Sequence, residues 1–335
     1  GIDSSGFNIG KFSSHNIINY INSFNSDIVH LQWINDTFIG INDLYKIKAP
    51  LVWTMRDMWP FSYGGYHYDY KYKILNQDNM IKSIKIDMNN KLNKKIHLQK
   101  IRSYAKIKNL TTVGISKWIS DSANDSKIFG NHKVLYIPNA IDRKKFKPLD
   151  WKKCREDLNL PKDKKLILFG AINSTNDIRK GYPFIEKILE KKFDGCDFVI
   201  FGNKDSKLIG KNKIHYFGRI NDDSFLAKLY NACDLFINPS LLDAHGKVSS
   251  ESLACNVPVV AFNSSGMKET IKHKVSGFLA KPYSLSDFIS GISWCLQNFD
   301  KETKNNICRR ESRKNDSINV AQSYYNLYKE ILANS

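Results

Sequence analysis

The fold is decided by residues 238–262, which read NPSLLDAHGKVSSESLACNVPVVAF from Asn238 to Phe262. The pattern predicts a strand end, a loop, a short helix that stops before Asn256, and a buried strand. Asp243 and Glu251 flank Gly246 in the loop. In an open α/β sheet, ligands bind where strand ends meet helix N-termini. A carboxylate there can accept two hydrogen bonds from a ribose diol, although a first-turn Glu that only stabilises its own helix is the simpler interpretation.

The remainder of the chain alternates apolar runs with helical spacing, so we expect an α/β fold with mainly parallel sheets. In a first series, we expect strands over 26–33, 51–55, 111–115 and 134–137. We also expect a helix over 38–47, one long helix or a pair of helices over 80–108, and a helix after a Ser116 cap. In a second series, we expect strands over 166–169, 198–201, 214–217, 235–238 and 258–262, helices over 184–191 and 226–232, and a last helix over 318–332. The polar segment 143–165 reads as an interdomain connection. The first series is short, which indicates that an N-terminal strand and its loop are missing from the chain.

Composition is that of a globular protein large enough for two domains, with 335 residues of which 42% are hydrophobic. The six Cys all follow residue 150 without a CxxC pair, which favours free thiols in a reducing compartment. The net charge is +18, and residues 71–108 alone hold eleven Lys and Arg against two Asp. This charge favours an anionic partner such as a nucleotide, a phosphorylated lipid surface or a nucleic acid, unless the lysines are simply solvated.

Several catalytic motifs are absent, including GxGxxG, the P-loop, HExxH, GxSxG and a DxD pair. Their absence argues against a dinucleotide dehydrogenase, an NTPase, a zinc protease, a serine hydrolase and a metal-dependent transferase. Arg179-Lys180-Gly181 follows the first strand of the second series, which ends at Gly170. A cation at this position can neutralise a leaving diphosphate, and a solvated Arg-Lys pair is the equally weighted alternative.

Together these segments resemble the E-x7-E signature region of retaining glycosyltransferases of family 4, which have the GT-B fold. The resemblance rests on Asp243-x7-Glu251 with the apolar run after it, on the segment 137–142 (IPNAID), and on the run 229–240 (LYNACDLFINPS). Residues 29–35 (VHLQWIN) and 53–59 (WTMRDMW) are similar to the subgroup that builds bacterial exopolysaccharide, capsule or O-antigen.

The resemblance implies two Rossmann-like domains facing each other across a cleft. Residues 1–145 would form the acceptor-side domain, and residues 146–315 the domain that binds the nucleotide sugar. Residues 316–335 would form a C-terminal helix that packs back on the first domain. No cofactor and no metal is expected, because the nucleotide sugar is the substrate.

The resemblance implies a role for each residue of this sequence that matches a functional position of the family. Glu251 would bind the donor ribose, while Asp243, Arg56 and Lys180 would be the catalytic residues at the sugar and the diphosphate. The remaining donor-binding residues would be Arg179, Gly170, Arg219, Ile220, Gly246, Lys247 and His245. Asp57 and His67 would line the acceptor cleft.

The sequence also departs from the family pattern. Asp243 is one methylene shorter than the usual Glu, and Ala171 replaces a phosphate-binding Arg. Arg56 stands where the family often has a His, so it can stabilise diphosphate charge but cannot act as a base. The loop 64–68 lacks the subgroup's Cys residues, which makes His67 an acceptor-cleft or surface residue rather than a metal ligand.

The resemblance therefore implies transfer of a sugar from a nucleotide-sugar donor to a glycan or lipid-linked acceptor in cell-surface polysaccharide synthesis. We expect a cytoplasmic protein that docks peripherally on the anionic inner face of the plasma membrane through its basic segment. A catalytically weakened GT-B protein that acts as a binding or scaffold partner is the alternative. Nucleic-acid binding is not expected, because no aromatic and basic interleaved motif accompanies the charge.

Overall fold

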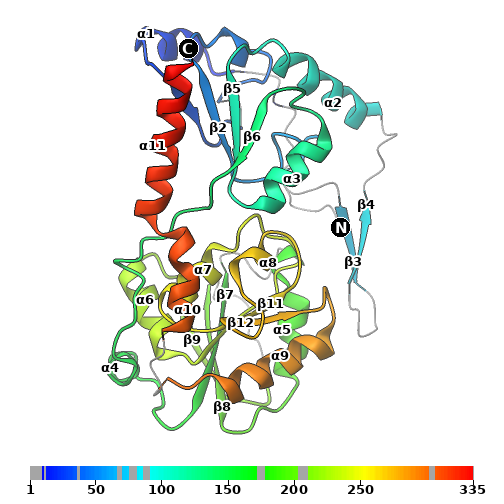
Figure 1. Ribbon diagram of the computed structural model, residues 1–335. Helices are drawn as coiled ribbons and strands as arrows, with labels where there is room; N and C mark the ends of the chain where they lie inside the picture. The colour runs from blue at the N-terminus through cyan, green and yellow to red at the C-terminus, as the bar shows by residue number, and fades with distance from the viewer. Residues whose placement is uncertain are drawn as a thin grey trace. The chain divides into compact units, whose positions relative to one another are not determined.

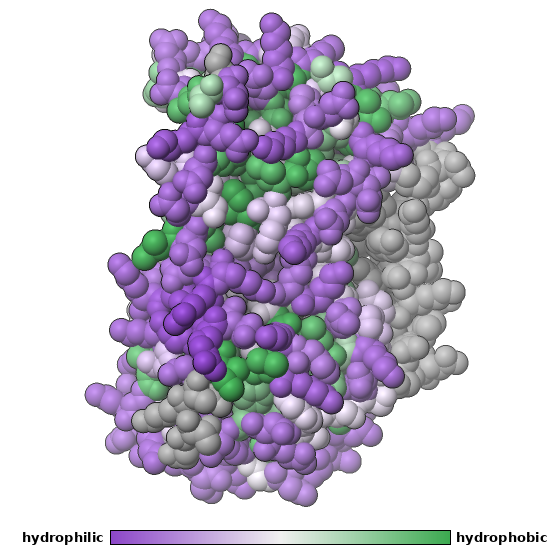
Figure 2. All heavy atoms as spheres, viewed as in Figure 1, coloured by the Kyte–Doolittle hydropathy of each residue, from purple (hydrophilic) through white to green (hydrophobic). Residues whose placement is uncertain are grey.

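The computed structural model describes residues 10, 13–35, 38–65, 70–74, 81–85, 91–171, 178–202, 210–301 and 306–334. These residues divide into two units (Figure 1). The first unit comprises the described residues within 1–71, 83–139 and 318–335, and the second those within 72–82 and 140–317. Hydrophilic side chains cover most of the face shown in Figure 2, in keeping with the large content of Lys and Arg.

The first unit is a four-stranded parallel sheet with the order β1-β2-β5-β6. Its elements are α1 (Ile17–Ser23), β1 (Val29–Leu31), the 3-10 helix η1 (Leu44–Lys46), β2 (Leu51–Met55), α2 (Lys91–Tyr104), β5 (Leu110–Gly114), α3 (Lys117–Ser126), β6 (Lys133–Tyr136) and α11 (Ser317–Ala333). β3 (Tyr70–Ile74) and β4 (Ile81–Lys85) form a separate two-stranded sheet. The four strands of the parallel sheet and the Ser116 cap of α3, whose hydroxyl accepts the Ile119 N–H, are as predicted.

The alternation of side chains along β2 gives the sheet two different faces. Val52 packs with Val320 and Leu327 of α11 on one face. Trp53 points the other way, where its ring meets Tyr104 of α2 edge to face and lies against Phe129. The C-terminal helix α11 therefore completes the core of the first unit (Figure 1).

The helical predictions for two segments of the first unit are wrong in part. Within 38–47 only η1 is helical, and the apolar spacing instead comes from turns that bury Ile39, Ile41 and Leu44. Among the described residues of 80–108, the chain first forms β4 and is then helical from Lys91 to Tyr104. Pairing of β4 with β3 overrides the helical spacing of its apolar residues.

The second unit is a six-stranded parallel sheet with the order β12-β11-β10-β7-β8-β9. Its first elements are α4 (Trp151–Asp157), β7 (Lys165–Ala171), the 3-10 helix η2 (Ile178–Lys180), α5 (Tyr182–Leu189), β8 (Cys196–Gly202), β9 (Ile214–Gly218) and α6 (Asp223–Ala232). Then follow β10 (Leu235–Asn238), α7 (Lys247–Ala254), β11 (Val259–Phe262), α8 (Met267–Thr270), β12 (Gly277–Ala280), α9 (Leu285–Asn298), α10 (Ile307–Glu311) and the 3-10 helix η3 (Ser312–Asn315).

Both faces of this sheet are buried, because its strands alternate between two apolar cores. Leu166 and Leu168 of β7 join the core that contains residues of α6 and α7. Ile167 and Phe169 join the core that contains residues of α5 and α9. This is a doubly wound α/β unit.

A buried ion pair holds α4 at the amino-end edge of the sheet. Arg155 donates to Asp234 Oδ2 at 2.6 Å and also to the carbonyls of Ala232, Pro161 and Lys164. The same Asp234 oxygen accepts the Leu166 N–H at the start of β7 at 2.7 Å. A guanidinium with several donors in a fixed plane can satisfy this many carbonyls, which an ammonium could not.

We predict that Arg155→Met lowers the free energy of unfolding by about 3 kcal/mol, because it leaves a buried carboxylate without its main counter-ion. Urea unfolding followed by circular dichroism measures the change. Lys153→Met, an exposed change on the same helix, should cost less than about 0.5 kcal/mol. Equal midpoints for the two variants would contradict the structural role of the pair.

Candidate functional site

The strand order of the second unit creates one point where the chain reverses direction in the sheet. From β7 the chain runs through β8 and β9 to one edge, and then from β10 through β11 and β12 to the other. β7 and β10 are parallel neighbours, so the loops that follow them leave the same edge side by side. This is the topological switch point at which doubly wound sheets bind ligands.

The two loops at the switch point are joined directly. The Leu241 N–H donates to the carbonyl of Arg179 at 2.6 Å. Gly181 has a φ of 74°, and a Cβ there would clash with the carbonyl of Pro239. Lys180 Nζ reaches Asp243 Oδ2 at 3.0 Å. The structure thus brings together the predicted catalytic residues Lys180 and Asp243, which are 63 positions apart in sequence.

Asp243 organises its own loop. Oδ1 accepts the N–H groups of His245 at 3.3 Å and Gly246 at 3.0 Å, while its backbone carbonyl accepts the Gly266 N–H. Burial alone would raise the pKa of Asp243, but Lys180 and these N–H donors outweigh it and lower the pKa to about 2. A side chain that bonds amides two and three residues ahead must be short, which gives a physical reason for Asp at this position.

His245 points into the unit rather than out of it. Its side chain is 4% exposed, and Nε2 lies 2.8 Å from Asn315 Nδ2 and 3.3 Å from Ser250 Oγ. The carbonyl of His245 accepts from Thr270 at 2.7 Å. This geometry makes His245 a brace for the loop, and donor contact remains a prediction for it.

Glu251 lies in α7 and is 3% exposed. Oε2 accepts the hydroxyl of Tyr230 at 3.2 Å, and Oε1 lies 3.4 Å from the ammonium of Lys247, whose side chain is 63% exposed. Burial raises the pKa of Glu251 against the opposing effect of Lys247. A buried carboxylate whose cation is mostly solvated can exchange that cation for other donors.

The remaining donor-site predictions fall in different surroundings. Gly246 begins α7 with a φ of 74°, and its N–H is given to Asp243. Arg219 is exposed after β9, while Ile220 packs partly against the core. Gly170 lies against the Phe201 ring, where any Cβ would clash.

The predicted residues of the first unit follow β2. Arg56 is exposed and donates to Gln32 Oε1 and Asn139 Oδ1, both at 2.9 Å. Asp57 accepts the Trp59 N–H at 2.9 Å, and burial raises its pKa to about 6. His67 and the segment 172–177 lie outside the described residues. The roles of Arg56 and Asp57 remain predictions.

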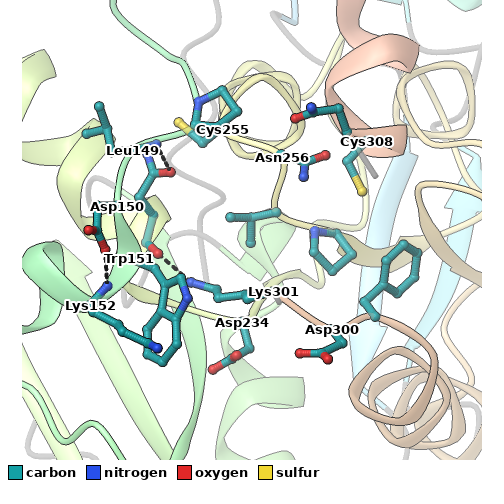
Figure 3. Close-up of a pocket in the computed structure, with 16 residues that line it drawn as sticks. Leu149, Asp150, Trp151, Lys152, Asp234, Cys255, Asn256, Asp300, Lys301 and Cys308 are labelled. Carbon is teal, nitrogen blue, oxygen red and sulfur yellow. Dashed lines mark hydrogen bonds between the residues drawn. The ribbon is translucent and has the colours of Figure 1, made fainter. Parts of the chain in front are cut away.

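One cavity of the second unit contains none of the predicted residues. It measures about 530 Å³ and is lined in part by Trp151, Asp234, Pro258 and Lys301 (Figure 3). Asp234 and Pro258 precede β10 and β11, so the cavity lies at the amino ends of these strands, at the edge opposite the switch point. Lys301 fills part of it and donates to the carbonyl of Asn231.

The described part of the chain shows neither a metal-binding cluster nor a membrane-spanning helix. In these residues, His, Cys, Asp and Glu form no cluster of three or more suited to a metal ion. In the same residues, no helix has the length and apolar content needed to cross a membrane.

Comparison with known proteins finds a family similar to the second unit. Residues 151–314, just under half of the chain, match the family described as glycosyl transferases group 1. This segment is therefore similar to a glycosyltransferase group 1 domain. It contains Lys180, Asp243 and Glu251 and ends one residue before Asn315.

Two curated relatives of the chain are also glycosyltransferases by their names. The chain is 29% identical to an uncharacterized glycosyltransferase of Methanocaldococcus jannaschii, over 59% of this chain and 54% of the relative. It is 25% identical to the N,N'-diacetylbacillosaminyl-diphospho-undecaprenol alpha-1,3-N-acetylgalactosaminyltransferase of Campylobacter jejuni, over 62% and 54%. The matches span about half the length of these relatives.

Solved structures show the fold of the chain. Sucrose-phosphate synthase from Thermosynechococcus elongatus superposes with a TM-score of 0.69 at 16% identity, over 95% of this chain and 76% of that one. Anabaena HepE in complex with UDP and glucose gives 0.66 at 15% identity, over 94% and 81%. The predicted GT-B fold with two parallel sheets is confirmed.

We predict that Asp243→Ala lowers the free energy of unfolding by about 2 kcal/mol at pH 7. Because the pKa of Asp243 is lower in the folded state, its charge stabilises the fold at pH values above the pKa of the unfolded state. This contribution disappears as the pH falls towards 2. Chemical denaturation at pH 7 and pH 3 measures the difference. Asp223→Ala removes an exposed pair with Lys145 and should cost less than about 1 kcal/mol. A pH-independent loss in Asp243→Ala would contradict the electrostatic explanation.

We predict that replacing Asp57 changes the free energy of unfolding in the opposite direction. Its raised pKa means that the ionised carboxylate destabilises the folded state above about pH 6 and has no such cost below about pH 4. Asp57→Asn should therefore raise the free energy of unfolding by about 2 kcal/mol at pH 7.5, with no gain at pH 4. Asp27→Asn, on an exposed residue of the same unit, is the control. No gain at pH 7.5 would show that Asp57 is ionised at no cost.

Proposed function

We propose that the chain is a retaining glycosyltransferase that transfers a sugar from a nucleotide-sugar donor to a glycan or lipid-linked acceptor in cell-surface polysaccharide synthesis. The observation that carries the proposal is the meeting of Lys180, Asp243 and the start of α7 at the switch point of a group 1 domain. Two neighbouring structures of HepE hold UDP with glucose and UDP-glucose, which supports a nucleotide-sugar donor.

Lys180 is suited to the donor diphosphate. An ammonium has three N–H donors, and only one is needed for Asp243. The remaining donors can approach phosphate oxygens, and Arg179 adds a second positive charge beside them. Because Asp243 is already engaged by Lys180 and by two amides, its part is to hold the ammonium and the loop in place. These groups are preorganised for the charge that develops on a departing diphosphate.

Glu251 is suited to the donor ribose. Tyr230 holds Oε2, and the solvated ammonium of Lys247 covers Oε1. Ribose hydroxyls can replace that ammonium as donors without exposing a bare charge. In this proposal Lys247 moves aside when the donor binds, while α7 keeps the carboxylate fixed.

The sugar bond then loosens towards an oxocarbenium-like state as the diphosphate leaves. The acceptor hydroxyl attacks on the same face of the ring, and its proton passes to the departing diphosphate oxygen. The chain's residues supply positioning and charge stabilisation rather than a nucleophile. The alpha-1,3-N-acetylgalactosaminyltransferase named above, which acts on a diphospho-undecaprenol compound by its name, supports a lipid-linked acceptor.

We predict that Glu251→Gln weakens donor binding by about 10- to 100-fold, because an amide offers one acceptor oxygen where the carboxylate offers two charged ones. Isothermal titration with a panel of UDP-, GDP-, dTDP- and ADP-sugars identifies the donor first, and hydrolysis of that donor gives a second readout. The burial that raises the Glu251 pKa implies that the neutral Gln variant remains folded.

Glu186→Gln, on an exposed residue of α5 in the same unit, is the matched control and should bind the donor like the wild type. Binding of a donor that Glu251→Gln leaves unchanged would refute the assignment of α7 to the ribose. A wild-type chain that binds a nucleotide sugar but never hydrolyses or transfers it would instead support the binding or scaffold alternative.

A further inference from the structure

A second candidate site lies wholly within the first unit. β1 and β2 are parallel neighbours with Leu31 opposite Trp53, so the residues that follow them leave the sheet together. Residues of these two segments and Trp53 surround a hollow of about 10 Å³, which is lined by Gln32, Trp33, Ile34, Asn35, Trp53, Arg56, Asp57, Trp59 and Pro60. A space of this size admits one hydroxyl or one water molecule but not a ring.

Two hydrogen-bond acceptors, Asn35 Oδ1 and the Asp57 carboxylate, belong to residues that line the hollow. Asn35 is 3% exposed, and its buried Oδ1 accepts no hydrogen bond from any residue that the structure describes. Asp57 accepts the Trp59 N–H and a side-chain hydrogen bond from Trp33. A carboxylate can accept about four hydrogen bonds, so Asp57 retains lone pairs that can accept more. A buried acceptor without a donor costs free energy that a bound hydroxyl would recover.

Trp33 lines the hollow and is also in contact with solvent. It is 48% exposed, which is unusual for so large an apolar side chain. Its side chain bonds Asp57, so the ring is held in place rather than free to rotate. A fixed indole face offers the flat apolar surface that matches the C–H face of a pyranose.

The two cations near the hollow are already bonded to oxygen atoms of the first unit. Arg56 is bonded to the amide oxygens of Gln32 and Asn139, and Lys100 is buried with its ammonium bonded to the carbonyls of Trp59 and Ser62. Asn35 Oδ1 and the Asp57 carboxylate line the hollow with acceptor positions that no described donor fills, and both groups can only accept hydrogen bonds. The ligand group inside must therefore donate, as a sugar hydroxyl does and a phosphate does not.

We propose that this hollow is a subsite for the acceptor carbohydrate, in which a pyranose ring stacks on Trp33 and one of its hydroxyls enters the hollow and donates to Asp57 and Asn35. The inference rests on the proposed function only in identifying the bound sugar as the acceptor. Binding of a sugar at Trp33 can be tested without any donor. The subsite reads the sugar of the acceptor and not its phosphate groups.

The test is saturation-transfer NMR on the full chain with methyl α- and β-glycosides of glucose, galactose, N-acetylglucosamine and N-acetylgalactosamine. At least one glycoside should show saturable binding, and Trp33→Ala should weaken it by about tenfold. Trp33→Phe keeps an aromatic face but loses the indole N–H, so its loss should be smaller. Asn35→Ala should also weaken binding. Tyr45→Ala removes an exposed aromatic of the same unit and should change nothing.

The outcomes separate this inference from the proposed function. No saturable glycoside, a signal that Trp33→Ala leaves unchanged, or displacement of the glycoside by inorganic phosphate would each overturn the subsite. If nucleotide sugars bind while Trp33→Ala has no effect on glycosides, the function stands and the subsite falls. If glycosides bind through Trp33 but no nucleotide sugar binds, the subsite stands as a sugar site and the proposed function falls.

Discussion

The carboxylate of Asp243 is the group on which the arrangement of the second unit's site depends. One oxygen holds the ammonium of Lys180 from the loop after β7, and the other holds two amides of the loop after β10. Without it, two loops from opposite halves of the sheet would have to be ordered by their backbones alone. Parallel strands place the loops at one edge, and among the described residues this ion pair, the bond from Leu241 to Arg179 and the close approach of Gly181 to Pro239 set their separation. The sheet thus supplies the location, and a single short side chain supplies the geometry.

Much of this site could be predicted from the sequence because it is local. Strand ends, Gly positions and the short α7 follow from patterns within 25 residues, and Lys180 follows a strand that the pattern also predicts. The inward position of His245 could not be predicted, since its partner Asn315 is 70 residues away and bears no motif. The helix α9 was missed although Ser284 caps it by accepting the Asp287 N–H, a signal that was present in the sequence. In the first unit, β4 was predicted as helix because pairing between strands is a tertiary decision.

Asn315 also shows that the loop depends on residues outside the group 1 match, which ends at residue 314. The Ile141 N–H donates to the Asn315 carbonyl at 2.7 Å, while Arg143 reaches Ser312 and Asp316. Arg309 in turn donates to the carbonyls of Phe146 and Ala254, the last residue of α7. The segment that enters the second unit and the segment that leaves it are therefore bonded to each other and to both ends of the α7 region. Asn315 is bonded both to Ile141 of the entering segment and to His245 of the loop. A change in the path of either segment would therefore shift the partner of His245.

Two of the three carboxylates predicted from sequence as site residues, Asp243 and Asp57, have opposite environments, and this contrast separates their roles. Asp243 accepts from the Lys180 ammonium and from two backbone amides, so its pKa falls to about 2 and it stays charged whatever binds nearby. Asp57 is buried with too few donors, so its pKa rises to about 6 and the fold tolerates its charge at a cost. Beside it, Asn35 retains a buried oxygen without a described donor. A satisfied carboxylate organises a loop, whereas an unsatisfied one gains free energy only when a ligand supplies the missing hydrogen bonds. The first unit therefore keeps unused acceptor capacity at the ends of β1 and β2, which is the condition that a hydroxyl-bearing ligand requires.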